Sequence, residues 1–86
     1  MRIFMQTPAL GVEQPKYYQL RLQKDLLGAW ILTREWGQPG TRTSLRREQY
    51  VKFEEAEAAL DRAREVQKKK GFQVMFSQGS EGPQPR

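Results

Sequence analysis

Residues 16–40 read KYYQLRLQKDLLGAWILTREWGQPG, and this stretch decides the fold. In its first part, Lys16–Gln23, apolar and polar side chains alternate, with the apolar ones at positions 18, 20 and 22. Such alternation is typical of a half-buried β-strand. The later part, Ala29–Trp36, is rich in aromatic and β-branched residues, and the connection between the two parts is short enough for a hairpin. We therefore expect these segments to pair as antiparallel strands.

The segments on either side of this hairpin extend the expected sheet. Gln38-Pro39-Gly40-Thr41 places Pro and then Gly at the central positions of a type II turn, where Pro fixes φ and Gly takes the positive φ that follows. A third strand should return through Thr41–Tyr50, with one solvated face. Met1–Gln6 alternates weakly and is interpreted as an edge strand, and Thr7–Pro15 as a connector.

Phe53–Lys69 is the segment with helical periodicity. Its first turn is acidic, its end is basic, and Gly71 suits a left-handed C-terminal cap. Glu65 and Lys69 have the spacing of an i,i+4 ion pair. Phe72–Phe76 alternates as a last short strand, and the segment 77–86, rich in Gly and Pro, is expected to be a disordered tail. The helical residues expected to face the sheet are Phe53, Ala56, Ala59, Leu60, Ala63 and Val66.

Together these elements predict an α+β fold, a small antiparallel sheet of four to five strands with one helix packed on one face. We expect a single domain over residues 1–76, because 86 residues and 10.1 kDa leave no room for a second core. The N-terminal apolar run is too short for a signal peptide, and no stretch reaches about 18 apolar residues. We therefore expect a cytoplasmic protein that has no membrane partner.

The composition argues against most enzymes and metal sites. The chain has no Cys and no His, so it has no thiol nucleophile, no imidazole base, no disulfide and no Cys/His metal site. A site made only of carboxylates would need Asp and Glu side chains to converge in a cleft, which so small a chain rarely forms. We expect no enzymatic activity and no catalytic residues, metal or cofactor.

The charge balance favours an anionic partner. The net charge is +5 and the pI is near 9.9. Residues 1–50 carry eight basic and four acidic groups, whereas residues 51–86 carry seven and six, so the excess lies in the first half. Nucleic acid is the usual partner of such a basic surface. A surface that serves only solubility is the alternative.

Four motifs, taken in order, sharpen this prediction. They are KYYQL (16–20), GAWILTREWGQPG (28–40), an acidic Ala-rich EEAEAAL (54–60) and KKKGF (68–72). Their order and spacing resemble the WGR domain, over roughly residues 15–73. This family occurs as small stand-alone bacterial proteins and within DNA-dependent poly(ADP-ribose) polymerases, and the opening strand with its Pro-containing connector looks like the stand-alone form. The resemblance implies a small α+β domain that binds DNA.

The tripeptide that names the family departs from its pattern at one position. Trp36 and Gly37 match, but Gln38 stands where the family has Arg. In the polymerases the Trp packs against the sugar of a terminal nucleotide and the Arg contacts neighbouring domains. The resemblance thus implies a stacking role for Trp36. The role of the Arg does not carry over to Gln38, which can donate a neutral hydrogen bond to a phosphate or base but lacks the charged fork of Arg. Lys16 and Tyr18 fall where the family supplies backbone contacts.

Each candidate contact also has a structural interpretation. Trp30 is expected in the core, Tyr18 is more readily a core residue than a contact, and Trp36 could be either. Basic residues on the third strand could form a solvated edge that prevents aggregation, with positions 42 and 46 on one face and 47 on the other. The lysines at positions 68–70 could simply complement the helix end. The candidate nucleic-acid contacts are Lys16, Tyr18, Trp36, Gly37, Gln38, Arg42, Arg46, Arg47, Lys68, Lys69 and Lys70.

Two functions from different classes follow. The first is a non-enzymatic, monomeric nucleic-acid-binding module that binds DNA at ends, nicks or gaps, through phosphate contacts and one aromatic stack and without reading sequence. The second is a protein–protein interaction domain, an adaptor that makes no contact with nucleic acid. The acidic helix face and the Gln at position 38 favour the adaptor, whereas the basic balance and the indole at the strand end favour DNA.

Overall fold

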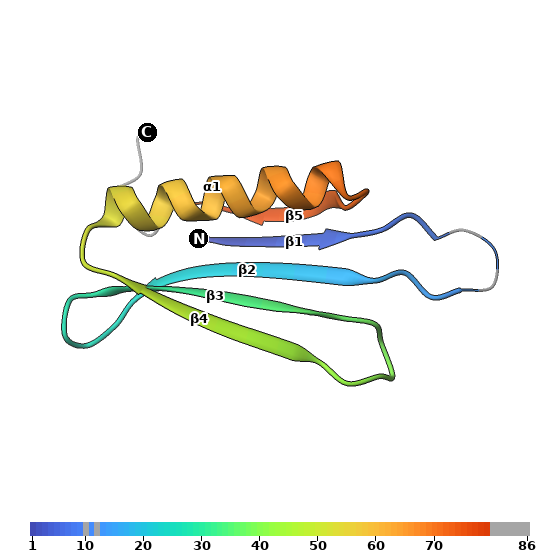
Figure 1. The fold of residues 1–86 in the computed structure, drawn as a ribbon, viewed down its shortest axis with the longest axis horizontal. Helices are drawn as coiled ribbons and strands as arrows, with labels where there is room; N and C mark the ends of the chain where they lie inside the picture. Colours follow the sequence, from blue (N-terminus) through green and yellow to red (C-terminus); the bar gives the residue numbers. More distant parts are fainter. Residues whose placement is uncertain (10, 12, 80–86) are drawn as a thin grey trace.

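The computed structural model describes residues 1–9, 11 and 13–79, and shows an α+β fold with one helix packed against a five-stranded antiparallel sheet (Figure 1). The strand order is β4-β3-β2-β1-β5. The fold class predicted from the sequence is therefore confirmed. The elements are β1 (Arg2–Gln6), β2 (Tyr17–Lys24), β3 (Trp30–Gly37), β4 (Ser44–Tyr50), α1 (Phe53–Lys69) and β5 (Gln73–Gln78).

β2 and β3 form the expected antiparallel hairpin, which lies inside the sheet. The strands are antiparallel, and their register runs from Tyr17 opposite Gly37 to Lys24 opposite Trp30. Asp25 closes the connection, because its Oδ1 accepts hydrogen bonds from the backbone N–H groups of Leu27 and Ala29, each at 2.9 Å. Both strands begin one residue later than the alternation suggested, which keeps the same side chains on each face.

The turn between β3 and β4 has the predicted type II geometry. The Thr41 N–H donates to the Gln38 carbonyl at 3.0 Å, and Gly40 has φ of 83°. The third strand begins only at Ser44, so Arg42 lies in the loop before it. The expectation that Arg42 shares a strand face with Arg46 is therefore wrong, because strand alternation does not extend to Arg42.

The first strand lies inside the sheet, not at its edge. β1 pairs with β2 on one side and with β5 on the other, both antiparallel. Its side chains Ile3 and Met5 are buried at 4% and 0% exposure. The weak alternation of these five residues does not show that the strand has a neighbour on both sides. An interior strand is defined by its partners, and here one partner is the last strand in the sequence.

The helix has the predicted bounds and buries most of the predicted face. Gly71, with φ of 104°, ends it in a Schellman arrangement: the Gly71 N–H donates to the Lys68 carbonyl and the Phe72 N–H to the Gln67 carbonyl. Two details differ from expectation. Val66 is 47% exposed while Gln67 is buried, and Glu65 pairs with Lys68 at 3.6 Å and with Arg64, not with Lys69. The buried helical residues are Ala56, Ala59, Leu60, Ala63 and Gln67.

The last strand is longer than expected. β5 runs to Gln78, so residues 77 and 78 belong to the sheet and not to a tail that starts at residue 77. The rest of the predicted tail, residues 80–86, lies outside the described residues. Within the described part of the chain, no helix has the length and apolar character needed to cross a membrane.

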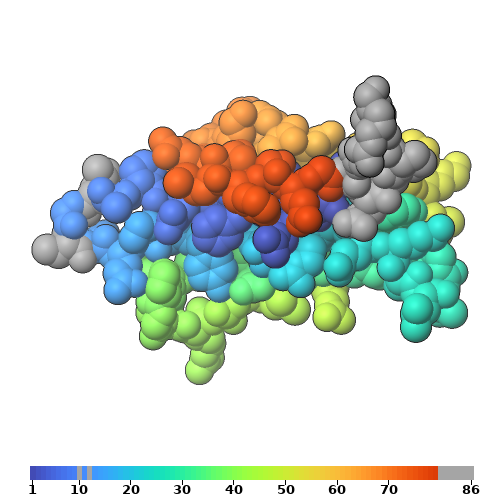
Figure 2. All heavy atoms as spheres, turned by 180° about the vertical axis from the view of Figure 1, so that it is seen from behind, coloured from blue at the N-terminus to red at the C-terminus, as the bar shows by residue number. Residues whose placement is uncertain are grey.

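The core lies between α1 and one face of the sheet, and no other described helix or strand packs on the opposite face, which we call the uncovered face. Along β1 and most of β2, every second residue points to the helix and is buried, whereas the residues between them face outward. In β3 only Leu32 is buried, and Trp30, Arg34 and Trp36 in the same row are partly buried. From the opposite side, β5, β1 and β2 are visible next to one another at the surface (Figure 2). The buried apolar residues are Ile3, Met5, Tyr18, Leu20, Leu22, Leu32, Ala56, Ala59, Leu60 and Ala63.

Candidate nucleic-acid interface

Trp36 lies near the end of β3, on the helix side of the sheet, and packs on a buried ring. It pairs in register with Tyr18 of β2, and the two rings stack with centroids 5.5 Å apart and an interplanar angle of 13°. Tyr18 is 7% exposed, and Phe72 meets it edge-on at 5.9 Å. The indole is partly buried. It is thus held in one orientation by a ring that belongs to the core, and Tyr18 acts here as its support.

Trp30 occupies the other end of β3 and has a different environment. Its ring meets Phe53 edge-on at a centroid distance of 4.8 Å, and it packs against the core. Of the two indoles, the one at position 30 is a packing residue, as expected. The one at position 36 combines a fixed orientation with an adjacent hollow.

That hollow has a volume of about 470 Å³ and lies between the sheet and the end of the helix. Arg34 enters it from β3 and Lys70 from the C-terminal cap of α1. A flat aromatic ring therefore borders a depression that also holds two cationic side chains. The residues lining it are Tyr18, Arg34, Trp36, Val66, Gln67, Lys70 and Phe72.

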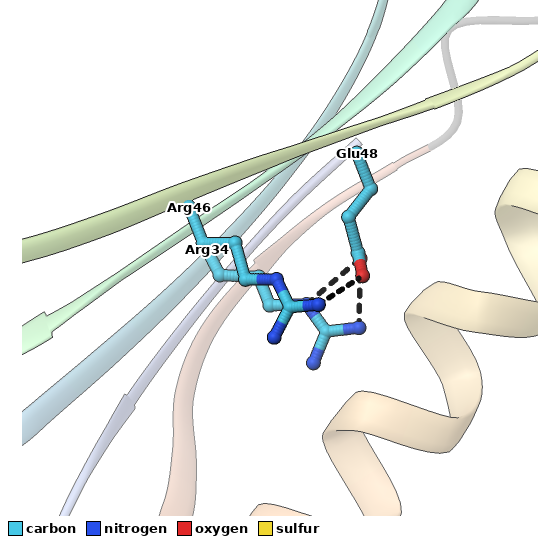
Figure 3. A network of polar contacts seen from close by, with 3 residues as sticks. All are labelled: Arg34, Arg46 and Glu48. Carbon is cyan, nitrogen blue, oxygen red and sulfur yellow. Dashed lines mark hydrogen bonds and ion pairs between the residues drawn. The ribbon is translucent and has the colours of Figure 1, made fainter.

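Arg34 belongs to a charge network on the helix side of β3 and β4 (Figure 3). Its Nε and Nη2 both donate to Glu48 Oε1, at 3.0 and 2.8 Å. Burial disfavours the charged guanidinium, but the neighbouring Tyr18 hydroxyl and the Glu48 carboxylate outweigh that effect and raise the pKa of Arg34. Arg46 contacts the second oxygen of Glu48 at 3.6 Å, and its side chain is 66% exposed. With two cations and one carboxylate, the network keeps a net positive charge.

Gly37 and Gln38 organise the backbone at this end of the sheet. A Cβ on Gly37 would lie 3.2 Å from the Arg42 carbonyl oxygen, so the missing side chain lets the loop before β4 pass close to β3. Gln38 Nε2 donates to the Gln14 carbonyl at 2.7 Å and thereby ties the turn to the connector that precedes β2. The amide at position 38 thus already has a structural partner.

The remaining candidate residues lie in three places. Lys16 and Arg42 are exposed near Gly37, at the same end of the sheet as Trp36. Lys68 and Lys69 are exposed on the helix end, where Lys68 pairs with Glu65. Arg47 points to the opposite face of the sheet from Arg46, as the alternation predicted, so it is separated from the other candidates.

Arg34 is the residue of this region that the sequence interpretation missed. It stands between Leu32 and Trp36 on the same strand face, since strand residues two apart share a face. That spacing was the available signal. A charged side chain in the row that faces the helix needs a partner of opposite charge. The partner here is Glu48 on β4, and the sequence of β3 alone cannot identify it.

No group of His, Cys, Asp and Glu that could hold a metal ion occurs among residues 1–9, 11 and 13–79. The side chains around Trp36 donate hydrogen bonds and carry positive charge, which suits contact with an anionic ligand beside an aromatic ring.

Comparison with known proteins agrees with the motifs in the sequence. The family model of the WGR domain matches residues 1–77 of the 86 residues. No curated protein and no solved structure matches the chain. The match spans all five strands except the last residue of β5, together with the helix and the Trp36 region. The chain therefore belongs to the WGR domain family.

Proposed function

We propose that this protein binds DNA at ends, nicks or gaps, through phosphate contacts and one aromatic stack, without reading the sequence. The WGR domain is a nucleic-acid-binding module in some proteins and by itself a non-catalytic domain. The observation that carries the proposal is the stacking of Trp36 on the buried Tyr18 beside a hollow that holds Arg34 and Lys70. An end, nick or gap exposes the sugar and base faces that an indole can contact, whereas a continuous duplex does not.

Cations around the indole supply the phosphate contacts of this proposal. Arg46 and Lys70 lie on the helix side, and Lys16 and Arg42 lie at the nearby end of the sheet. Arg34 is held by Glu48, so its contribution is to keep the hollow positive. Phosphate contacts position a ligand and carry no sequence information. The helix packs on the sheet and exposes Glu54 and Glu55 in its first turn, which disfavours its entry into a DNA groove.

The proposal is tested with duplexes that differ only in their ends. Labelled DNA with blunt ends, with a nick, or closed at both ends by hairpin loops is titrated with protein at two salt concentrations. If the protein contacts about four phosphates, a fourfold rise in salt weakens binding roughly 100-fold. Tighter binding to open or nicked duplexes than to closed ones supports the proposal, and equal affinity for all three contradicts the preference for ends.

The two Trp residues allow a direct readout of the indole. In a Trp30→Phe variant, Trp36 is the one remaining Trp, and the edge-on packing against Phe53 keeps an aromatic ring. Its fluorescence should change when an open end binds and should not change with closed duplexes at matched occupancy. A fluorescence change that is identical for both DNAs would place the contact elsewhere.

Protein–protein interaction is the second candidate function. The observation that favours it is the outer edge of the sheet: among the described strands β4 pairs only with β3, and Leu45 on this strand is 56% exposed. An exposed strand edge can pair with a strand of another protein. Absence of salt-dependent binding to every DNA in the titration would favour this candidate over DNA binding.

A further inference from the structure

The uncovered face of the sheet carries a row of basic residues that the Trp36 region does not use. The register places Gln78, Arg2, Arg21, Thr33 and Arg47 next to one another across all five strands. Side chains in register share a face, and the alternate positions on β1 and β2 are buried core residues, so this row points away from the helix. With strands about 4.8 Å apart, Arg2 and Arg21 are direct neighbours and Arg47 lies about 10 Å beyond.

Arg2 and Arg21 face each other without a carboxylate between them. Like charges directly opposite on antiparallel strands are destabilising. Neither residue forms an ion pair or a side-chain hydrogen bond with any described residue, and the Nε atom of each is covered and has no acceptor. They line a shallow hollow of about 230 Å³ together with Met1, Gln23 and Gln78. Among residues 1–9, 11 and 13–79, no anion neutralises this pair of guanidinium groups.

Aromatic rings adjoin these arginines on the same face. Phe4 and Tyr17 stack with centroids 6.2 Å apart and an interplanar angle of 16°, and Phe76 lies directly opposite Phe4 in the register. The Arg2 guanidinium lies over the Phe76 ring, 5.2 Å from its centroid. Phe76 is 46% exposed. Aromatic rings and guanidinium groups on the exposed face of a sheet are surfaces on which unpaired bases stack.

Among the described residues, the acidic groups that the strands and the β2–β3 connection place on this side already accept hydrogen bonds. Glu35 is the carboxylate that the strands place on this face, and the Tyr17 hydroxyl donates to it at 3.2 Å. Asp25 lines the hollows beside Arg47, but its Oδ1 accepts two backbone N–H groups of the hairpin connection. Neither carboxylate pairs with Arg2, Arg21 or Arg47. The face is therefore both basic and aromatic over β1, β2 and β5.

We propose that this face is a second site, which binds a single strand of nucleic acid: Arg2 and Arg21 contact its phosphates, and its bases pack on the surface of Phe4, Tyr17 and Phe76. A duplex keeps its bases stacked inside and would leave the rings without a partner. This site lies on the opposite side of the sheet from Trp36, so it goes beyond the binding of duplex ends and is separable from it.

The test uses the full chain and a labelled oligothymidylate of about 12–16 nucleotides, the length that one small domain can cover. Arg21→Gln should weaken its binding about fivefold or more and lower the salt slope by about 0.7, the value for one phosphate of a single strand. Arg62→Gln removes the same charge from an exposed position on the helix and should change binding less than twofold. Equal effects of the two variants would overturn the proposal.

A second variant tests the rings without removing charge. Phe76→Leu keeps an apolar side chain on β5 but removes the aromatic surface, and should weaken binding of the oligothymidylate about fivefold or more at an unchanged salt slope. Melting curves of each variant separate loss of binding from unfolding. A folded Phe76→Leu protein that binds as the wild type does would overturn the role of the rings.

The duplex titration separates this proposal from the one for Trp36. Arg21→Gln should weaken binding to blunt duplexes no more than Arg62→Gln does, and Trp36→Ala should leave oligothymidylate binding within twofold. This reciprocal pattern supports two sites. If Trp36→Ala abolishes binding of both DNAs, the single strand binds at Trp36 and the second site is overturned; if no oligothymidylate binds at all, it is overturned whatever the duplexes do.

Discussion

The Trp36 and Tyr18 rings lie nearly parallel, 13° apart, with their centroids separated by 5.5 Å across the β2–β3 pair. The two side chains differ in their exposure to solvent. Tyr18 is 7% exposed and contacts Phe72 with its edge, whereas the indole above it is partly open and borders a positively charged hollow. A ligand that packs on Trp36 therefore meets a ring whose orientation is already fixed, which lowers the entropy cost of binding.

Trp36→Ala should weaken binding to open or nicked DNA by about 1–3 kcal/mol, the range for loss of one base–aromatic stack, with sugar packing taken as comparable. The salt slope should remain that of the wild type, because no phosphate contact is removed. Trp36→Phe, which keeps a ring on Tyr18, should lose less. Fluorescence anisotropy gives the affinities, and dispersed amide resonances must first show that each variant is folded. A folded Trp36→Ala protein with wild-type affinity would exclude Trp36 as the contact.

Arg42→Ala and Arg46→Ala should act through charge instead. Each should weaken binding to closed and open duplexes alike and lower the salt slope by about one unit. Arg46 has a side chain 66% exposed and only a 3.6 Å contact with Glu48, so its removal leaves the Arg34–Glu48 pair in place. Anisotropy titrations over a series of salt concentrations measure the slope. Arg62→Ala is the matched control, and an equal effect of that control would argue against specific phosphate contacts.

Leu60→Asp tests the core between helix and sheet. Leu60 is 1% exposed, so the variant buries a charge without a partner and should lower the free energy of unfolding by more than about 3 kcal/mol. Val66→Asp introduces the same group on the same helix at a position 47% exposed, where the cost should stay below about 1 kcal/mol. Urea denaturation followed by circular dichroism measures both. Similar values for the two variants would contradict the assigned helix face.

The helix could be predicted from the sequence because its signals are local. Apolar spacing locates the helix and Gly71 marks its end, whereas no capping side chain marks its start at Phe53. The prediction that Val66 faces the sheet is wrong: Val66 is apolar yet exposed, and Gln67 is polar yet buried. Hydrophobicity alone does not fix which residue at the margin of a stripe faces the sheet, since that depends on the angle at which the helix crosses the strands.

The sheet and the site depend more on contacts between distant residues. The β2–β3 pairing could be predicted, because both strands and their short connection lie in one stretch. The interior position of β1 could not, since it requires β5, more than 60 residues later. Trp36 was a candidate from its motif, but its support by Tyr18 and the network of Arg34, Arg46 and Glu48 arise only when three strands align.

Gly71→Ala tests the left-handed cap that ends the helix. Gly71 has φ of 104°, and a Cβ there would meet no atom within 4 Å, so the cost of the variant is conformational and not steric contact with the rest of the fold. The free energy of unfolding should fall by about 1–2 kcal/mol. Gly71→Asn should lose less, because Asn tolerates this region better. Thermal or urea unfolding measures both, and an unchanged stability of the Ala variant would contradict the cap geometry.

Gln38→Arg tests how the Arg of the family's motif would affect DNA binding by this chain. Gln38 Nε2 now donates to the Gln14 carbonyl at 2.7 Å, and an Arg at this position still offers N–H donors for that carbonyl while adding a charge near Lys16 and Arg42. We therefore expect the affinity for all duplexes to rise slightly and the salt slope to increase by about one unit, with no greater preference for open ends, because the added group contacts phosphate and not the terminal sugar.

Gln38→Ala is the matched variant that removes the hydrogen bond without adding charge, and should lower the free energy of unfolding by about 1 kcal/mol while the salt slope stays constant. Anisotropy titrations of blunt and closed duplexes measure the slopes and the preference. If Gln38→Arg instead increases the preference for open ends, the residue at position 38 reaches the terminal nucleotide itself, and end recognition does not rest on Trp36 alone.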